Sequence, residues 1–428
     1  MSRFIINGQR PLQGCFTPLG NKNAVLPMLA ACVLTDEPVV LHNVPWIDDV
    51  RVMLELLAAL GVDIQTCERS VTLTAGALRP APLDPVLCRR VRSSILLAGP
   101  LTARHGAAKL YPPGGDVIGR RRVDTHFDGL EALGIEVHAN QAYTLTRRQL
   151  KAADIVLDEA SVTATENILM AAVLAPGRTS IYNAACEPHI QDLGALLIRM
   201  GARIEGLGTN RLLVDGVDAL HGAEHTVQPD HIEIGSFIAA AAATGGRLQV
   251  ACGPKTGSLR VVERAYGRLG VTWQSQGEQL LLDACSGRPI ATDLGLAIPK
   301  IEDGPWPSFP SDLMSVAIVL ATQAEGTILF FEKMFESRMY FVDHLIAMGA
   351  RIVQCDPHRV VVSGPCCLHG SHMSSPDIRA GMALLIAALC AQGQSVIENA
   401  GMIDRGYERI EERLQALGAD ITREKGTP

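Results

Sequence analysis

The sequence lacks the signatures of several large enzyme classes. It contains no GxxxxGK[ST], HExxH, GxSxG or GxGxxG motif, so it offers no P-loop, zinc-protease helix, nucleophile elbow or dinucleotide fingerprint. Its 11 cysteines are an odd number, form no CxxC pair and have no histidine partners at zinc spacing. We therefore expect no disulfide framework, no metal site and no bound nucleotide cofactor.

Long apolar runs and a basic charge balance are also missing. No uninterrupted apolar run approaches about eighteen residues, and residues 1–11 contain no apolar leader segment. The 38 Lys and Arg residues face 45 Asp and Glu residues, for a net charge of −7, whereas nucleic-acid-binding proteins usually present a basic face. We expect a cytoplasmic protein that binds neither nucleic acid nor membrane, in which any anion site is local.

What the sequence does contain is a sixfold repeat. The 428 residues, 47% of them hydrophobic, suffice for two or three domains with deep cores. A Leu-Gly or Met-Gly step that ends a helix and leads into a short apolar strand recurs with glycines at positions 61, 134, 201, 270, 349 and 418. The spacing is roughly seventy residues, which predicts one supersecondary unit used six times.

Each unit begins with an apolar helix whose first turn carries a polar residue. Counting back fourteen positions from the residue that ends each helix gives Lys22, Arg92, Thr163, His231, Asp312 and Arg379. Equivalent positions in repeats should be geometrically equivalent, and the N–H groups at helix starts attract anions. A polar residue at a helix start is also commonly only a cap, although Lys and Arg are poor caps.

Periodicity within a unit predicts its local structure. Residues 24–34 are apolar on all sides, as in a helix packed inside a domain, and residues 39–44 form a strand. A second helix starts at Asp48 or Asp49 and ends before the strand at 62–64. The last unit repeats this pattern, with a buried helix at 382–391.

One segment differs from the repeats. Tyr111–Asp124 combines three glycines, two prolines and three consecutive arginines. This composition is typical of a mobile loop that carries charge over a ligand, although an exposed, solvated loop has the same composition.

Six motifs, in order along the chain, together resemble the UDP-N-acetylglucosamine enolpyruvyltransferase family. They are GNKNA at 20–24, PGGDVIGR at 113–120, ATEN at 164–167, FPSD at 309–312, FESR at 335–338 and IDRGYER at 403–409. The resemblance implies a two-domain inside-out α/β barrel of six βαβαββ-type units, three in each domain. It places the first domain at residues 22–229, with the 111–122 loop as a lid, and the second at 1–21 and 230–428.

The family reaction is an enolpyruvyl transfer. The resemblance implies that the enolpyruvyl group of phosphoenolpyruvate moves to the 3-hydroxyl of UDP-N-acetylglucosamine with release of phosphate, by addition and then elimination. This is the first committed step of peptidoglycan synthesis. Two alternatives stay open at this point: transfer to a different acceptor, such as another nucleotide, and a catalytically silent UDP-sugar-binding homologue.

Residue by residue, the resemblance also implies a site. Asp116 is expected as the acid that protonates carbon 3 of phosphoenolpyruvate, and Asp312 as the base for the sugar hydroxyl. Cations are expected to bind the phosphate and carboxylate of phosphoenolpyruvate, because both groups are anionic. The resemblance assigns this role to Lys22, Arg121 and Arg405, with Arg338 and Arg379 lining the same cleft.

The nucleotide-sugar residues follow in the same way. The resemblance assigns the uridine, diphosphate or sugar to Asn23, Arg92, Val123, Asp124, Ser161, Val162 and Asp312. Glu187 and Asp230 resemble acidic residues around the cleft, and for Asp230 a role as a cap or hinge salt bridge is an equal alternative.

Some positions depart from the family pattern. Most members carry Cys where this chain has Asp116, and a carboxyl group cannot form the thioether by which fosfomycin inactivates the Cys enzymes. We therefore expect an active, fosfomycin-resistant enzyme. Four further departures, near the expected acceptor site, leave the identity of the acceptor less certain than the reaction: Arg122 for Pro, Thr163 for Gly, His231 for Arg and Met314 for Gln.

Overall fold

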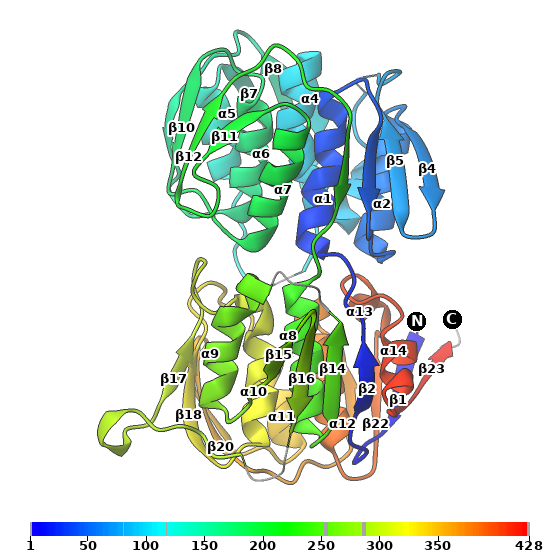
Figure 1. The fold of residues 1–428 in the computed structure, drawn as a ribbon, viewed down its shortest axis with the longest axis vertical. Coiled ribbons are helices and arrows are strands. Elements are labelled where there is room, and N and C mark those ends of the chain that lie inside the picture. The colour runs from blue at the N-terminus through cyan, green and yellow to red at the C-terminus, as the bar shows by residue number, and fades with distance from the viewer. Residues whose placement is uncertain (1, 80, 117, 252–255, 285–287, 426–428) are drawn as a thin grey trace. The chain divides into compact units, whose positions relative to one another are not determined.

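The structure is a computed structural model that describes residues 2–79, 81–116, 118–251, 256–284 and 288–425. Val117, Cys252 and Cys285 lie outside the described residues. The chain divides into two compact units (Figure 1). Unit 1 comprises residues 1–18, 117–120 and 229–428, and unit 2 comprises residues 19–116 and 121–228. Each unit is described on its own below.

Unit 2 contains three sheets, each with helices beside it. Among the described residues its sheets have the orders β4 (Asp63–Cys67), β5 (Ser70–Thr74), β3 (Val39–His42), β13 (Ala223–Thr226); β7 (Ile135–Ala139), β8 (Tyr143–Arg147), β6 (Ala107–Leu110); and β11 (Arg203–Glu205), β12 (Arg211–Asp215), β10 (Arg178–Tyr182), β9 (Asp154–Val156). Its helical segments are α1 (Lys22–Ala31), η1 (Cys32–Leu34), α2 (Asp48–Ala59), α3 (Pro85–Arg90), η2 (Arg92–Leu97), α4 (Ala98–His105), α5 (Asp124–Ala132), α6 (Val162–Ala172) and α7 (Pro188–Arg199).

Unit 1 repeats this plan. Its described sheets have the orders β15 (Gln274–Gln276), β16 (Gln279–Asp283), β14 (Arg247–Ala251), β2 (Gln13–Phe16); β19 (Ile352–Asp356), β20 (Arg359–Gly364), β18 (Gly326–Phe331), β17 (Lys300–Glu302); and β23 (Asp420–Lys425), β1 (Ser2–Asn7), β22 (Gln394–Glu398), β21 (His372–Ser374). Its helical segments are α8 (His231–Ala243), η3 (Thr256–Leu259), α9 (Arg260–Arg268), η4 (Leu294–Leu296), η5 (Ser311–Leu313), α10 (Met314–Thr322), α11 (Val342–Ala347), α12 (Ile378–Cys390), α13 (Gly401–Asp404) and α14 (Ile410–Ala416).

Among the described residues, five of the six sheets share one four-stranded topology, and the sheet of β6, β8 and β7 has its three antiparallel strands only; this explains the repeat seen in the sequence. In the third sheet of unit 2, β11 and β12 form an antiparallel pair, β12 pairs antiparallel with β10, and β9 completes the edge in parallel with β10. The equivalent parallel pairs elsewhere are β3 with β13, β14 with β2, β18 with β17 and β22 with β21. The predicted α/β architecture of six repeated units is confirmed.

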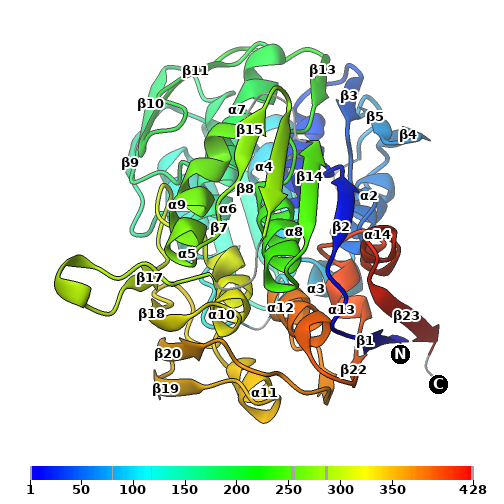
Figure 2. The same cartoon turned by 60° about the horizontal axis from the view of Figure 1, so that its bottom comes forward.

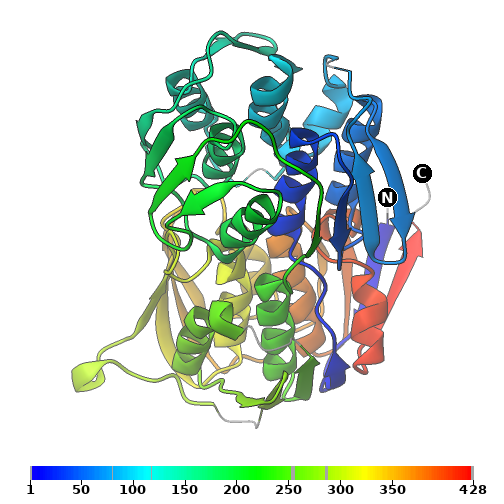
Figure 3. The ribbon, with the colours of Figure 1, turned by 45° about the horizontal axis from the view of Figure 1, so that its top comes forward.

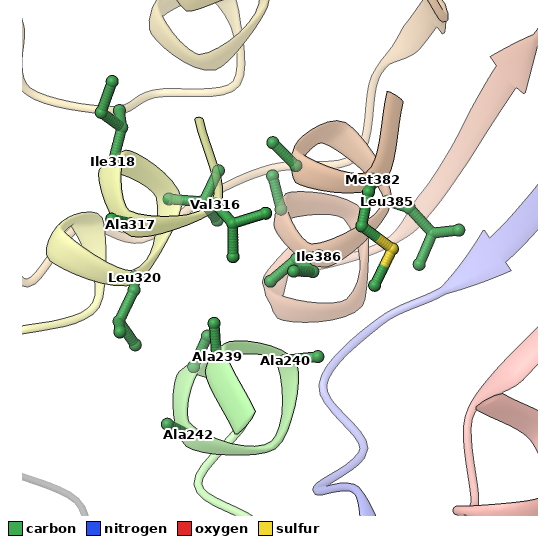
Figure 4. Packing of buried hydrophobic residues seen from close by; sticks show 14 of the residues in the cluster. Ala239, Ala240, Ala242, Val316, Ala317, Ile318, Leu320, Met382, Leu385 and Ile386 are labelled. Atoms are coloured by element: carbon green, nitrogen blue, oxygen red, sulfur yellow. The ribbon is translucent and has the colours of Figure 1, made fainter. Parts of the chain in front are cut away.

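Three helices form the centre of unit 1, and each is buried on every side. The helices α8, α10 and α12 contact one another, and their described residues are all buried. Figure 4 shows Ala239 of α8 on the side that faces Leu320 of α10 and Ile386 of α12, so a small side chain on α8 lets the helices approach closely. Most positions of these helices are apolar because sheets and outer helices surround them (Figure 2).

In unit 2 the buried helical segments are α1, η2 with α4, and α6. They contact one another, as the corresponding segments of unit 1 do. The predicted helix at 24–34 is α1 continued by η1, and the predicted second helix is α2, which starts at Asp48. The helix predicted at 382–391 is α12, which begins four residues earlier, at Ile378. No helix among the described residues is long and apolar enough to cross a membrane.

The chain contributes strands to sheets that are distant in sequence. Strand β1 pairs antiparallel with both β22 and β23, so the two ends of the chain share a sheet, as the blue and red strands of Figure 3 show. Strand β2 completes the sheet of β14, and β13 completes the sheet of β3. The first repeat therefore depends on a strand contributed about 180 residues later in the same unit.

Candidate active site

The six polar residues found by the fourteen-residue count all lie at the starts of the buried helical segments. Lys22, Arg92 and His231 are the first residues of α1, η2 and α8. Thr163, Asp312 and Arg379 are the second residues of α6, η5 and α12. The fold thus gathers three of these residues in each unit at one end of three packed helices.

In unit 1 an aspartate is held between two arginines. Arg338 Nη2 lies 2.8 Å from Asp312 Oδ1, and Arg379 Nη2 lies 2.9 Å from Asp312 Oδ2. Both arginine side chains are buried, whereas Asp312 remains about a quarter exposed. Each carboxylate oxygen of Asp312 therefore has a charged donor, and the group stays accessible from one side.

Burial and the charge of Asp312 together set the pKa values of the neighbouring Arg379 and His231. Burial lowers the pKa of Arg379, but the negative charges of Asp312 and Asp230 and the interaction with Tyr407 offset this, and the pKa ends above its ordinary value. Burial lowers the pKa of His231 to about 4, because the effect of Asp312 in the opposite direction is smaller. His231 is therefore neutral at pH 7, unlike the arginine typical of the family at this position.

Arg405 lies on a segment packed against the start of α12. It follows α13 directly, and the next residue, Gly406, lies so close to Ile378 that an added Cβ would come within 2.4 Å of that side chain. The buried ring of Tyr407 lies under the Arg379 guanidinium at 5.4 Å, and its hydroxyl bonds Ser236 at 2.9 Å. Unit 1 therefore brings the backbone at Arg405 next to Arg379.

In unit 2 the predicted phosphoenolpyruvate lysine is buried and paired. Lys22 Nζ lies 2.9 Å from Asp49 Oδ2, and both side chains are about nine-tenths buried. The side chain of Asn21 caps α1 by accepting hydrogen bonds from the N–H groups of Asn23 and Ala24. The cap fixes where the helix starts, and so where Lys22 lies.

Arg92 anchors the arginine segment of the lid loop. Its Nη2 donates to the carbonyl oxygens of Arg121 and Arg122, each at 2.9 Å. Burial, reinforced by the positive charge of Arg121, lowers the pKa of Arg92 to about 10. The guanidinium is still charged at pH 7, and it holds the backbone at Arg121 and Arg122, where the loop ends, in place.

Where the loop begins, its backbone conformation requires glycine at positions 114 and 115. The N–H group of Gly114 donates to Cys88 O at 3.1 Å, and a Cβ added to Gly114 would lie 1.7 Å from the carbonyl oxygen of Arg89. Gly115 follows with a φ of 109°, a conformation that favours glycine. Asp116 is the next residue, half-buried and still within unit 2.

The tip of the loop belongs to unit 1. Within that unit the carbonyl oxygen of Ile118 accepts from the N–H group of Ser337 at 3.1 Å, and the N–H group of Arg120 donates to Glu336 Oε2 at 3.2 Å. Ser337 and Glu336 directly precede Arg338, so the tip is tied to the segment that carries one of the Asp312 partners.

Four of the predicted nucleotide-sugar residues of unit 2 lie at the starts of α5 and α6. Val123 and Asp124 lie at the start of α5, where Asp124 accepts from Arg122 Nε at 2.9 Å. Ser161 caps α6, with its hydroxyl oxygen accepting from Ala164 N, and Val162 is the first residue of that helix. Backbone N–H groups at these two positions suit an anionic ligand.

A buried polar network extends to Thr163. Asn167 accepts from Gly99 N at 2.6 Å and donates to Ile95 O at 2.9 Å, which fixes the orientation of its amide. Its nitrogen also faces His126 Nδ1 at 3.1 Å, and burial lowers the pKa of His126 to about 3. His126 is therefore neutral and carries its proton on Nε2, which donates to Thr163 Oγ1 at 3.0 Å. The hydroxyl hydrogen of Thr163 therefore points away from His126.

The two acidic residues with open roles differ from each other. Asp230 caps α8, since its Oδ1 accepts from the N–H groups of Ile232 and Glu233. This observation favours the cap interpretation for Asp230. Glu187 occupies the N-cap position of α7 without a side-chain cap bond, and its charge helps to raise the pKa of the fully buried Glu166, after burial itself.

Sequence reasoning missed several residues that support the site. Asp49 was considered only as a helix start, and neither His126 nor Glu332 was considered. Asn167 and Tyr407 lie inside recognised motifs but had no assigned role. Because each of these residues acts through a neighbour on another segment of the chain, only the fold shows its contacts.

The chain is similar to known proteins along almost all of its length. The family model described as EPSP synthase (3-phosphoshikimate 1-carboxyvinyltransferase) matches residues 6–414. A UDP-N-acetylglucosamine 1-carboxyvinyltransferase of Bradyrhizobium diazoefficiens is 53% identical over 424 residues, which cover 98% of each chain. The protein of the same name from Treponema denticola is 51% identical, with 98% of this chain and 99% of the relative covered.

Solved structures show the same fold. The enolpyruvyl transferase NikO from Streptomyces tendae has a TM-score of 0.87 and 25% identity, and the match covers 99% of this chain and 98% of that one. EPSP synthase from Acinetobacter baumannii has a TM-score of 0.77 at 18% identity, with 99% and 100% of the two chains covered. The chain thus belongs to the EPSP synthase (3-phosphoshikimate 1-carboxyvinyltransferase) family, and it shares about half of its residues with UDP-N-acetylglucosamine 1-carboxyvinyltransferases.

Proposed function

We propose that this chain is a UDP-N-acetylglucosamine 1-carboxyvinyltransferase. It transfers the enolpyruvyl group of phosphoenolpyruvate to the 3-hydroxyl of UDP-N-acetylglucosamine and releases phosphate, and we propose that it does so in the cytoplasm, as the first committed step of peptidoglycan synthesis. The observation that carries the proposal is the full-length identity of 53% to a relative of that name. The Asp312 site, with a carboxylate held by two arginines, agrees with it.

The first half of the reaction is an addition. Asp116 donates a proton to carbon 3 of phosphoenolpyruvate, which makes carbon 2 electrophilic. Asp312 accepts the proton of the sugar hydroxyl as its oxygen bonds to carbon 2. The two hydrogen bonds from Arg338 and Arg379 orient the Asp312 carboxylate for this role, and the group remains about a quarter exposed.

The second half is an elimination. A proton leaves carbon 3, the double bond re-forms, and the bond from carbon 2 to the phosphate oxygen breaks. Asp116, now a carboxylate, takes that proton, so the same side chain acts first as acid and then as base. Phosphate leaves as the dianion or monoanion, and cations stabilise the charge that develops on it.

The anionic reactant requires cations to bind its charged groups. Lys22, Arg121 and Arg405 are proposed to bind the phosphate and carboxylate of phosphoenolpyruvate, with Arg338 and Arg379 adding to the positive field. The pairing of Lys22 with buried Asp49 holds the ammonium in one position. A fixed cation of this kind loses little entropy when the ligand binds.

The nucleotide sugar is proposed to bind at the starts of α5 and α6 in unit 2. Asn23, Arg92, Val123, Asp124, Ser161 and Val162 are the proposed contacts, together with Asp312 for the sugar. The salt bridges of Arg122 with Asp124 at 2.9 Å and with Asp158 at 2.8 Å hold the start of α5 in place. Arg122 thereby restrains the backbone at a position where the family has proline.

A different acceptor is the second candidate function. The observation that favours it is the Thr163 hydroxyl group, whose oxygen accepts from His126 at 3.0 Å, at a position where the family commonly has glycine. The similarity to an enolpyruvyl transferase that is 25% identical is compatible with the shared transfer reaction and does not define the acceptor.

A phosphate-release assay tests the proposal. Purified protein is incubated with phosphoenolpyruvate and UDP-N-acetylglucosamine, and released phosphate and the mass of the nucleotide product are measured. We expect stoichiometric phosphate and a product heavier by one enolpyruvyl group. Phosphate released only with another uridine nucleotide would establish the second candidate. Binding of UDP-N-acetylglucosamine without any phosphate would identify a silent homologue.

A further inference from the structure

Two buried carboxyl groups lie behind the Asp312 site. Glu332 follows β18 and Asp303 follows β17, and these strands pair in parallel, so the two residues leave the same end of one sheet. Their exposed fractions are 0% and 1%. Two buried negative charges on neighbouring strands would be strongly unfavourable, which makes the pair an anomaly that needs an explanation.

The hydrogen bonds of the pair leave one oxygen unsatisfied. Asp303 Oδ1 accepts from Lys333 N at 2.5 Å, whereas Asp303 Oδ2 is buried and has no hydrogen-bond donor among the described residues. Glu332 Oε1 accepts from the N–H groups of Met334 and Phe335 at 3.3 and 3.2 Å. A single proton on Glu332 Oε2, donated to Asp303, would satisfy the orphaned oxygen and remove one of the two charges.

The surrounding charged groups favour that shared proton. Burial, reinforced by hydrogen bonding and charge repulsion from Asp303, raises the pKa of Glu332 to about 9. Arg338 acts in the opposite direction, but its Nη2 is engaged by Asp312. The Lys333 ammonium pairs with Glu302 at 3.0 Å, and the His358 ring donates to the carbonyl oxygen of Glu332 and not to its carboxyl group.

The same carboxyl group joins two turns of the active site. The hydroxyl group of Ser311 lies 2.9 Å from each Glu332 oxygen, and Ser311 directly precedes Asp312. Met334 and Phe335, whose N–H groups also bond Glu332, lie shortly before Arg338. The two residues that meet at 2.8 Å, Asp312 and Arg338, are thus both carried by turns that Glu332 holds.

We propose that Glu332 is a positioning residue whose protonated carboxyl group, hydrogen-bonded to Asp303, holds the turns at 311 and 334–335 so that Asp312 and Arg338 stay in register. Loss of the shared proton places two charges side by side and separates the turns. The alkaline limit of catalysis is then set by Glu332, which touches no substrate. This inference rests on the proposed function only for its kinetic consequence.

The kinetic test is Glu332→Gln. A glutamine oxygen still accepts from the two backbone N–H groups, and its nitrogen still donates to Asp303, so the variant imitates the protonated pair at every pH. We expect near-parental kcat at pH 7 and an alkaline limb of the kcat profile moved upward by about one pH unit or more. Glu302→Gln, a change at the neighbouring residue outside the pair, should leave the limb unchanged. Equal limbs in the parent and Glu332→Gln would overturn the proposal.

Two measurements need no substrate. The raised pKa stabilises the folded parent most below the unfolded value of about 4.5, and this stabilisation is lost as pH rises towards 9. The melting temperature of Glu332→Gln relative to the parent should therefore increase across this range. The infrared spectrum of the parent minus that of the variant should contain a protonated carboxyl band at pH 7 that disappears above pH 9.

These measurements separate the two ways of failing. If no acceptor supports phosphate release, the proposed function fails, but the melting and infrared results still decide whether Glu332 holds the proton. A parent spectrum without the band would refute the shared proton even in an active enzyme. If Glu332→Gln does not fold, Asp303→Asn carries the same test, because an amide donor beside Glu332 removes its need for a proton.

Discussion

Asp312 and Arg379 come from two different repeats of unit 1 and meet at 2.9 Å, Nη2 to Oδ2. Asp312 is the second residue of η5, and Arg379 is the second residue of α12. The contact therefore exists because the repeats place equivalent helix starts side by side. Because the two equivalent positions carry different residue types, the contact pairs a carboxylate with a buried guanidinium.

The first prediction concerns Asp312→Asn. An amide cannot accept the proton of the sugar hydroxyl, so we expect kcat to fall by roughly 10²–10⁴-fold. The variant should still bind UDP-N-acetylglucosamine, measured by calorimetry, because the amide oxygen can still accept from one of the two arginines. Asp356→Asn, at an exposed carboxylate paired with Arg359, is the matched control and should retain parental kcat. A turnover of Asp312→Asn close to that of the parent would rule out Asp312 as the base.

The second prediction concerns Asp116. Because a carboxyl group cannot form a thioether, the parent should keep its activity during prolonged incubation with fosfomycin. Asp116→Cys should lose activity with time and gain the mass of the adduct on the intact protein. Asp116→Asn should lower kcat by about 10²-fold or more, because the substitution removes the acidic group while the side-chain volume stays nearly the same. An adduct on the parent, or full activity of the Asn variant, would contradict the assignment.

The third prediction concerns the buried pair of Lys22 and Asp49. Asp49→Asn weakens the charge partner of a lysine that is only 8% exposed. We expect the free energy of unfolding to fall by about 2 kcal/mol, measured in urea, and KM for phosphoenolpyruvate to rise. The double variant Lys22→Met with Asp49→Asn should recover stability but not activity. If the losses in the free energy of unfolding caused by the two single substitutions add up in the double variant, the two side chains are not coupled.

The fourth prediction concerns Thr163. Its oxygen accepts from His126, and its hydrogen is therefore available to a ligand at the start of α6. Thr163→Val, which keeps the shape but removes the hydroxyl group, should raise KM for the nucleotide sugar by roughly tenfold. Thr163→Ser should stay near the parental value, and KM for phosphoenolpyruvate should change little in either variant. Equal nucleotide-sugar KM values for Val and Ser would show that the hydroxyl group does not contact the ligand.

Much of the fold could be predicted because it repeats. The spacing of the Leu-Gly and Met-Gly steps predicts six units, and the fourteen-residue count finds the start of each buried helix to within one residue. These features are local, since helix ends and apolar patterns depend on neighbours along the chain. The pattern of the helix at 24–34 likewise showed that it would be buried on all sides.

The supporting contacts could not be predicted in this way. Lys22 was assigned from its motif, but its partner Asp49 lies on the next helix, α2, where it looks like an ordinary helix start. The network from Gly99 through Asn167 and His126 to Thr163 joins three helices of unit 2. Sequence position gives no information on such contacts, because they depend on which faces of the helices meet.

The sequence by itself determined the repeats, the buried helices and the residue types at their starts, because these follow from periodicity and from chemistry local to the chain. Only the tertiary structure decided which of those residues support each other. The register between strands β17 and β18 places Asp303 beside Glu332, and the packing of α8, α10 and α12 places Arg379 on Asp312. Burial and proximity, which shift pKa values and orient carboxylates, exist only once distant segments have packed together.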